Sequence, residues 1–378
     1  MEHKLIELHV AQLEKAWKKV KTCSFHDKRL QEHVALLDRL FNGIKEKVNN
    51  GIDLSKIEVY KRFIDFTFIN IEFIDSSTLN LIPYEIIRCL ESVLKEWLPD
   101  FEKYIIVTAL RQNVYSYSIS LASSLEAVYK AIEEEFKIVF PCRLIQLNIP
   151  KFLSRDYLAN VVLYHEIGHF IDNQYKISKT IVKGILATKK YDKYKDYLPA
   201  IEYIGKLSDS EVEQMMLNHT MEYFADIFAS QYIGDSSGNF LNYIAKDAPY
   251  SFTHPATKMR FQIVCDFMEK KENSIISALQ TASTSISKND LQLRNSTLSP
   301  DDFLNLIPVE VNSDSELHSL FVLGWEIWFN KIKEIHDVNQ IAIPLENNKL
   351  YLIINSLIEK SIGNYIVKEN WTYATKKS

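Results

Sequence analysis

The chain has 378 residues, of which 47% are hydrophobic, and a formal net charge of −5. This is enough apolar material for a large core in one or two domains, and the mild acidity gives no support for a nucleic-acid partner. Glycine is scarce, at nine residues, which favours helices over sheet. We expect a mainly α protein with a small β-sheet, an α+β fold.

No segment reaches the ~18–20 uninterrupted apolar residues that a membrane-spanning helix needs, and residues 1–5 show no signal-peptide core. We therefore expect no transmembrane segment and a cytoplasmic location. The four cysteines are scattered along the chain without the spacing of a metal site, which indicates buried free thiols rather than disulfides. They are Cys23, Cys89, Cys142 and Cys265.

The first hundred residues are predicted to be mainly helical. Apolar residues recur at helical spacing over residues 4–22 and 31–48. Residues 63–73 are rich in phenylalanine and isoleucine and predict a strand. A proline opens the next predicted helix, over residues 83–97. We assign residues 1–99 to an N-terminal, mainly helical region.

The following segment changes character. Residues 103–109 and 143–148 are predicted as strands, and a helix at 124–137 separates them. Two strands and a helix therefore precede the motif that carries the most information about function.

That motif is a histidine–glutamate–x–x–histidine segment from His165 to His169. On a helix the two histidines share one face, so both imidazoles can bind a single zinc ion. Glu166 is placed to hold a zinc-bound water and take its proton. Ser154 can cap the helix, which would put the motif in the second half of a long, buried helix. Gly168 lowers helix propensity, so we expect another part of the chain to approach its backbone closely.

A second pair of polar residues lies on a later predicted helix. Glu222 and Asp226 are four residues apart and share a face. The helix is expected to begin at a capping box of Ser210 and Glu213 and to end at Gly234. One carboxylate can bind the metal while the other hydrogen-bonds a ligand imidazole and fixes its tautomer. Two charges on the solvated side of the helix are the alternative interpretation.

Together, the two motifs resemble the gluzincin zinc metallopeptidases. A third element, Thr253-His254-Pro255 followed by Arg260, is similar to the histidine–proline and arginine element of the CAAX-type endopeptidase family. That family includes membrane prenyl-protein proteases and soluble or peripheral bacterial relatives. The resemblance covers residues 140–265 and implies a zincin-like core, here with added helical N- and C-terminal regions.

The resemblance implies a zinc-dependent endopeptidase with a polypeptide substrate and Zn²⁺ as cofactor. His165, His169 and Glu222 are the expected metal ligands, which leave one position for water. Glu166 is the expected proton acceptor, and it later delivers the proton to the leaving amine.

Further residues are expected to support this site. Asp226 would orient one ligand histidine, and Asp172, one turn beyond His169, is a candidate for the same role. His254 would contact the substrate or steady its oxyanion, although a turn histidine before proline is the alternative. The resemblance implies that Arg260 anchors the site through an acidic neighbour.

In the zincin fold, a sheet edge lies beside the metal and pairs with an extended substrate. The candidate edge strand is residues 142–148, which would offer Leu144, Gln146 and Asn148. An ordinary internal strand is the alternative. We assign residues 100–270 to the zincin-like catalytic domain.

Residues 271–378 are predicted to form a linker and a C-terminal helical region. Residues 281–299 are rich in serine, threonine and asparagine and predict a linker or mobile loop. Two helices with apolar stripes follow, and these stripes form either core or a docking face for a protein partner. The stripes are Leu317, Leu320, Phe321, Trp325, Trp328 and Ile332, and Ile354, Leu357, Ile358, Ile362 and Tyr365.

Two other functions fit the same motifs. The chain could be a regulatory or interaction protein with a structural or vestigial zinc site, although a purely structural site has no need of Glu166. It could also be a narrowly specific protease that cuts one protein, as a toxin or phage-defence effector would.

Overall fold

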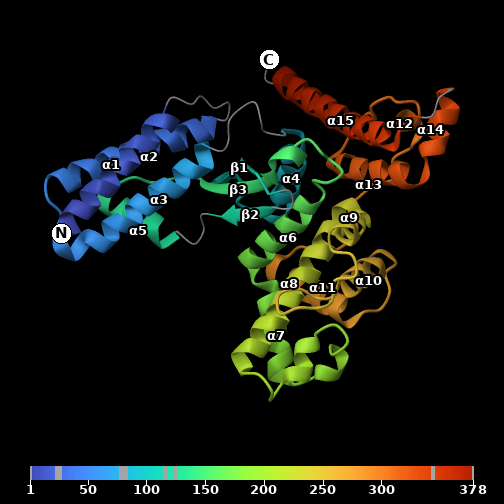
Figure 1. Cartoon of the computed structure of the whole chain (residues 1–378), viewed down its shortest axis with the longest axis horizontal. Coiled ribbons are helices and arrows are strands. Elements are labelled where there is room, and N and C mark those ends of the chain that lie inside the picture. The colour runs from blue at the N-terminus through green and yellow to red at the C-terminus, as the bar shows by residue number, and fades with distance from the viewer. Residues whose placement is uncertain are drawn as a thin grey trace. The chain divides into compact units, whose positions relative to one another are not determined.

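The computed structural model describes residues 2–21, 28–75, 84–113, 117–121, 126–341 and 345–376. Helices dominate these residues, and the strands among them form one small three-stranded sheet (Figure 1). The predicted fold class, mainly α with a small β-sheet, is confirmed.

The chain divides into two compact units, residues 1–83 with 98–154, and residues 84–97 with 155–378. These boundaries differ from the predicted regions, because residues 100–270 are shared between the two units. The helix at 84–97 belongs with the second unit since its apolar side packs there. For example, the Trp97 indole nitrogen donates a 2.7 Å hydrogen bond to the Tyr232 hydroxyl.

The first unit combines long helices with the sheet, around a core rich in aromatic rings. Phe66 packs edge-on against Tyr129 and Phe140, with ring centroids 4.7 and 5.6 Å apart. The helices are α1 (Glu2–Val20), α2 (Lys28–Asn49), α3 (Ile57–Asp75) and α5 (Glu126–Phe136), with the short 3₁₀ helices η1 (Leu54–Lys56), η2 (Phe101–Lys103) and η4 (Lys151–Leu153). The strands are β1 (Tyr104–Arg111), β2 (Ser118–Leu121) and β3 (Arg143–Pro150).

The prediction of a strand over residues 63–73 was wrong, because this segment is the middle of α3. The helix packs against α1, α2, α5 and the sheet, so its buried surface extends around most of its circumference. A helix buried in this way carries an apolar run as dense as that of a buried strand. The predicted helices at 4–22, 31–48 and 124–137 are present as α1, α2 and α5.

The prediction that strand 142–148 forms a sheet edge was also wrong. β3 is the central strand, parallel to β1 and antiparallel to β2. The Asn148 side chain accepts a 2.7 Å hydrogen bond from Arg111 and donates a 2.9 Å bond to the Ser118 hydroxyl, and Gln146 also accepts one from Arg111. Leu144 is fully buried. The alternative, an internal strand, is correct, and these three residues offer no free edge to a substrate.

Among the described residues of the second unit, the regular elements are helices joined by turns and irregular segments. Its larger helices are α4 (Tyr84–Trp97), α6 (Val162–Tyr175), α7 (Ile177–Thr188), α8 (Asp209–Ile233), α9 (Ser236–Ile244), α10 (Thr257–Met268), α11 (Ser274–Ser287), α13 (Asp314–Asn330) and α15 (Asn347–Lys376). The shorter ones are η5 (Tyr191–Lys193), η6 (Pro199–Tyr203), α12 (Asp301–Leu304) and α14 (Ile332–Val338). Pro83, predicted to open α4, lies outside the described residues.

The helix that carries the histidine motif starts later than predicted. Ser154 does not cap it, because its hydroxyl donates to the carbonyl of Lys151 and turns follow up to residue 161. α6 begins at Val162, so His165 lies in its first turn rather than in its second half. Asp156 accepts a hydrogen bond from the Ala159 amide within the intervening turn, which delays the helix.

α8 carries the second motif and is buried over most of its length. The observed capping box is Ser208 with Glu211. The predicted pair, Ser210 with Glu213, has the same spacing and lies two residues later. The predicted end at Gly234 is confirmed, with a φ of 57° that favours glycine.

α6 and α8 pack against each other through a glycine. A Cβ atom added at Gly168 would lie 2.7 Å from the Cα atom of Ala225 in α8, closer than real Cβ atoms come. The close approach expected at this glycine is confirmed. It brings the histidine motif within reach of Glu222 and Asp226.

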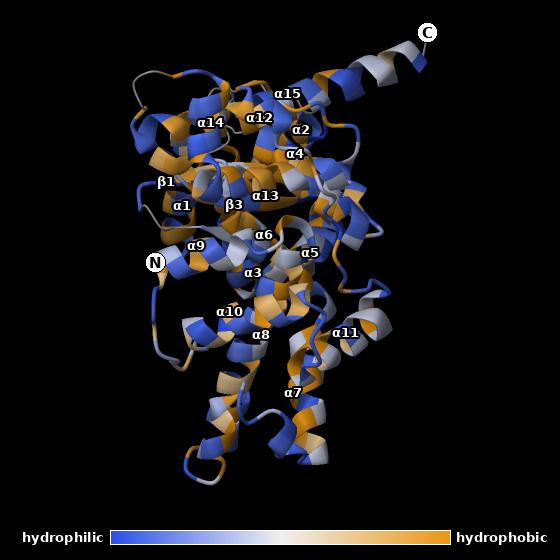
Figure 2. Ribbon diagram, turned by 90° about the vertical axis from the view of Figure 1, so that its right-hand side faces the viewer, coloured by the Kyte–Doolittle hydropathy of each residue, from blue (hydrophilic) through white to orange (hydrophobic). Residues whose placement is uncertain are grey.

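The C-terminal helices form core rather than an open face. The stripe residues Leu317, Leu320 and Phe321 are fully buried, and α13 packs against α15. In Figure 2 orange, hydrophobic stretches of ribbon surround the label of α13. The predicted linker at 281–299 is partly helical, since α11 continues to Ser287 before an irregular segment begins.

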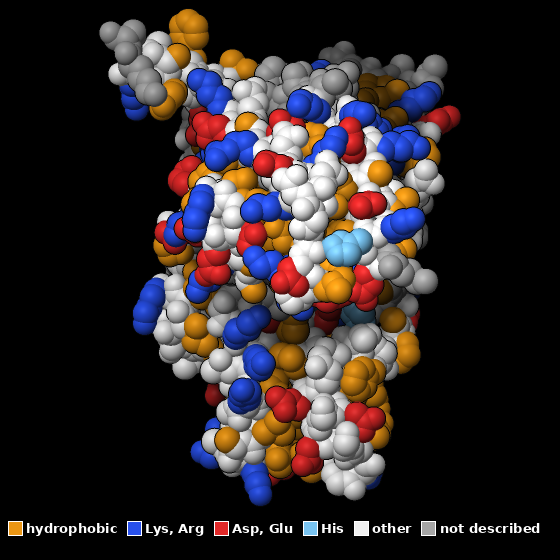
Figure 3. Space-filling view, turned by 90° about the vertical axis from the view of Figure 1, so that its left-hand side faces the viewer, with side chains coloured by type: hydrophobic (Ala, Val, Ile, Leu, Met, Phe, Trp, Pro, Cys, Tyr) orange, Lys and Arg blue, Asp and Glu red, His pale blue; other side chains and the backbone are white. Residues whose placement is uncertain are grey.

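Cys89 and Cys142 are buried and Cys265 is half-buried, and none of the three is in a disulfide, whereas Cys23 lies outside the described residues. None of the described helices is long and apolar enough to cross a membrane. On the face drawn in Figure 3, Lys and Arg side chains are interspersed with Asp and Glu, without a large field of one sign.

Candidate metal centre

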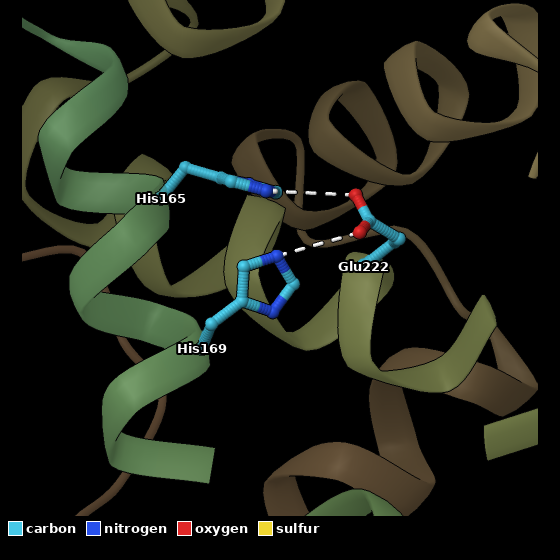
Figure 4. A group of neighbouring side chains, drawn as sticks. All are labelled: His165, His169 and Glu222. Carbon is cyan, nitrogen blue, oxygen red and sulfur yellow. Dashed lines mark ion pairs between the residues drawn. The ribbon is translucent and has the colours of Figure 1, made fainter. Parts of the chain in front are cut away.

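Three side chains from α6 and α8 face a common point (Figure 4). The Nε2 atom of His165 lies 3.5 Å from one carboxylate oxygen of Glu222, and the Nε2 atom of His169 lies 3.4 Å from the other. One ligand atom from each of the three residues lies within 4.8 Å of the others. Ligands that each bind an ion at about 2.0–2.2 Å have separations of this order. The group could therefore hold a metal ion.

Asp226 fixes the orientation of one of these imidazoles. Its Oδ1 atom lies 2.9 Å from the Nδ1 atom of His165, so Nδ1 carries a proton and Nε2 faces Glu222. Burial alone would lower the pKa of His165, but hydrogen bonds to Asp226 and Glu222 outweigh it and raise the pKa to about 9. In the metal-free protein a metal ion must therefore displace a proton from His165 at neutral pH.

Arg260, on α10, ties the two carboxylates together. Its guanidinium makes two hydrogen bonds to Asp226, at 2.8 and 2.7 Å, and lies 2.9 Å from Glu222. Burial alone would raise the pKa of both carboxyl groups, but Arg260 and the histidines outweigh it. They hold the pKa of Asp226 below its ordinary value and that of Glu222 well below it. Both groups are ionised at neutral pH.

Glu166 lies in the same pocket, where it is half-buried. Burial raises its pKa above the ordinary value, despite the nearby histidines. A carboxylate that is more basic than usual is suited to accept a proton.

The charges around the pocket favour a cation. The ionised side chains of Glu222 and Asp226 carry two negative charges, and Arg260 carries one positive charge. With neutral imidazoles these three groups sum to −1, so a metal ion bound there would face a net negative charge.

His254 comes from the loop between α9 and α10. Its Nε2 atom lies 3.6 Å from Glu222, and its side chain is 58% exposed. Its Nδ1 atom is 2.8 Å from the Thr253 hydroxyl. The structure thus brings His254 to the mouth of the pocket, beside the group formed by His165, His169 and Glu222.

Asp172 does not reach a ligand imidazole. Its carboxylate accepts a 2.7 Å hydrogen bond from the backbone amide of Ser178, because the chain turns at Lys176 and Asp172 then holds the start of α7. The expectation that Asp172 orients His169 is therefore not met, and the Nδ1 atom of His169 has no hydrogen-bond partner among the described residues.

Sequence reasoning missed the wall of the pocket. Phe240, Leu241 and Ile244 on α9 line a cavity of about 240 Å³ together with Val162, one turn before Glu166. α9 is short and carries no charged motif, so only the spacing of its apolar residues could have indicated a role. Ser237 also lines the cavity.

Comparisons with protein-family models, with curated proteins and with solved structures found no match for this chain. The resemblance to gluzincins therefore rests on the motifs and on the geometry described above.

Proposed function

We propose that the protein is a zinc-dependent endopeptidase of the gluzincin type, related to the CAAX-type endopeptidases. The observation that supports this most strongly is the convergence of His165, His169 and Glu222 beside Glu166, in a pocket that opens to solvent. Two imidazoles and one carboxylate are the ligand set of many catalytic zinc sites. The same donors suit zinc better than magnesium or calcium, which prefer oxygen ligands.

Each residue of the site has a distinct role in this proposal. Zinc, when bound, supplies a water of lowered pKa and polarises the scissile carbonyl. Glu166 accepts the proton of the attacking water and delivers it to the leaving amine. Asp226 keeps His165 oriented, and His254 donates a hydrogen bond to the carbonyl oxygen as negative charge develops there.

The shape of the pocket argues against a purely structural metal site. Structural zinc sites are closed by four protein ligands, whereas a catalytic site keeps one position open. Among the described residues, three side chains form the ligand group, and the pocket that they line is open. The presence of Glu166 in that pocket also favours a catalytic site over a vestigial one.

The pocket suits one side chain and its peptide unit. Its volume of about 240 Å³ is below the ~300–1,000 Å³ typical of pockets that enclose drug-sized ligands. The carboxylates, the arginine and the histidines lie beside the apolar residues of α9 and Val162. We propose a polypeptide substrate that places an apolar side chain against α9.

Glu166→Gln tests the proposal, because it removes the proton acceptor and keeps nearly the same shape. Wild-type protein and this variant would be expressed in matched cells grown with zinc. New protein N-termini in the two cultures would then be compared by mass spectrometry. We expect new N-termini with the wild type only, since loss of a general base lowers the rate by about 10²–10⁴-fold. Identical cleavage by both would disprove the mechanism, and no cleavage by either would count against a peptidase.

A further inference from the structure

The loop that carries His254 is fastened to α8 close to the metal ligands. The Nε2 atom of His219, one turn before Glu222, lies 2.7 Å from the carbonyl oxygen of Ser251. A carbonyl oxygen can only accept, so this nitrogen carries a proton. The neighbouring Asn218 side chain donates a 3.2 Å hydrogen bond to the carbonyl oxygen of Phe252. Two adjacent residues of α8 thus hold the loop just before His254.

Within the loop, the hydroxyl of Ser251 accepts two hydrogen bonds. The backbone amides of Thr253 and His254 donate to it, at 3.3 and 3.0 Å. A serine hydroxyl has two lone pairs and one proton. Both lone pairs are therefore used, and the proton is left to donate. Its neighbours are the Thr253 hydroxyl, at 3.2 Å, and the carbonyl oxygen of His254, at 3.5 Å.

This count favours one direction for the next hydrogen bond. The Thr253 hydroxyl cannot donate to Ser251, because the lone pairs there are occupied. It lies 2.8 Å from the Nδ1 atom of His254, where the tautomer of the imidazole decides which atom donates. With the Thr253 hydroxyl as the donor, Nδ1 accepts and the proton of the neutral imidazole is on Nε2.

The Nε2 atom of His254 faces the site. It is 3.6 Å from Glu222, which is too long for a direct hydrogen bond. An N–H group in this position can donate to an oxygen that enters the pocket. It cannot bind a metal ion, because metal coordination requires a free lone pair on that nitrogen.

We propose that Ser251 and Thr253 are positioning residues that hold His254 as the Nε2–H tautomer, so that it donates to an anionic oxygen of the substrate instead of becoming a fourth metal ligand. His219, through its hydrogen bond to Ser251, holds the loop at a fixed position relative to Glu222. The role of the donated hydrogen bond rests on the proposed peptidase function, whereas the tautomer itself does not.

Nuclear magnetic resonance can read the tautomer directly. Full-length, zinc-loaded protein with ¹⁵N-labelled histidines would be studied by long-range ¹H–¹⁵N correlation at about pH 8.5, where histidines are ordinarily neutral. His254→Gln would assign the signals. The matched pair is Thr253→Val, which removes the hydroxyl at constant size, and Thr253→Ser, which keeps it.

We expect His254 to show the Nε2–H pattern in the wild type. In Thr253→Val we expect the pattern of a mixture of the two tautomers. Thr253→Ser should keep the wild-type pattern. An Nδ1–H or metal-bound pattern in the wild type would overturn the proposal, as would an unchanged pattern in Thr253→Val.

A kinetic measurement then separates this inference from the proposed function. On a cleaved peptide, Thr253→Val should lower kcat about 10–100-fold with little change in KM or zinc content, and Thr253→Ser should restore the rate. Equal rates in wild type and Thr253→Val would overturn the positioning role. If the wild type cleaves no peptide, the peptidase proposal fails, and the spectra still decide the tautomer.

Discussion

Two helices of this protein, α3 and α8, are buried along most of their length, yet they bury different groups. The buried polar side chains of α3, Thr67 and Asn70, are neutral, and each donates a hydrogen bond within its own helix. Thr67 and Asn70 bond to backbone carbonyls one turn earlier, and Asn70 also bonds to His33 at 2.9 Å. α8 buries the charges of Glu222 and Asp226, which depend on partners from other helices.

The two helices illustrate two kinds of burial. Burial of apolar groups stabilises the fold by itself, whereas burial of charged groups stabilises it only when their partners are present. Aromatic and aliphatic side chains around α3 stabilise the fold wherever they are removed from water. A buried carboxylate is costly without a counter-charge, so α8 depends on Arg260 and the two imidazoles. Such conditional burial is typical of functional sites.

Removing Arg260 should break this arrangement most severely. Arg260→Met leaves two buried carboxylates without their cation, which typically costs about 3–5 kcal/mol. Hydrogen exchange of α8 amides in the metal-free protein would show the loss, because these amides exchange through opening of the unit.

Phe66→Ala is the matched control for this change. It should cost a similar ~3–5 kcal/mol through a cavity in the first unit while leaving metal affinity unchanged. If Arg260→Met leaves α8 as protected as in the wild type, the carboxylates do not depend on the guanidinium.

The two carboxylates of α8 should also differ from each other. Glu222→Ala removes a ligand, whereas Asp226→Ala removes only the partner of His165, for which losses are typically about 10–100-fold. Competition with a chelator should therefore rank Glu222→Ala as the weaker binder of zinc. The reverse order would exchange the roles of the two residues.

A smaller effect is expected at the contact between α6 and α8. Gly168→Ala places a methyl group 2.7 Å from the Ala225 backbone and should cost about 1–3 kcal/mol by overpacking. Gly184, in α7, has nothing within 4 Å of an added Cβ atom, so Gly184→Ala should stabilise by up to about 1 kcal/mol. Thermal unfolding of both variants would test this. Equal changes in melting temperature for the two variants would mean that α6 and α8 are not in close contact at Gly168.

The sequence predicted several helices, among them α1, α2 and α5, together with the end of α8 and the close approach at Gly168. It did so because these features depend on local spacing and on glycine. It also identified the residues that meet at the site, because spacing of four residues fixes which side chains share a helix face. Their distances needed the packing of α6 on α8.

The failures have a common origin in tertiary contacts. The apolar run of α3 looks like a strand only when its packing on several sides is unknown. The position of β3 between two partners is not encoded in β3 itself. The role of Asp172 depends on the turn at Lys176, which the spacing between Asp172 and His169 does not reveal. The α9 wall was missed because short apolar helices carry no motif.

The zinc content of the native protein is the plainest test of the proposed metal centre. Elemental analysis of protein purified without added metal or chelator should find about one zinc per chain in the wild type and a large loss in His165→Ala. Glu166→Gln should keep its zinc, since Glu166 is not among the ligands. Absence of zinc from the native protein, with no difference between wild type and His165→Ala in zinc uptake, would disprove the proposed zinc site.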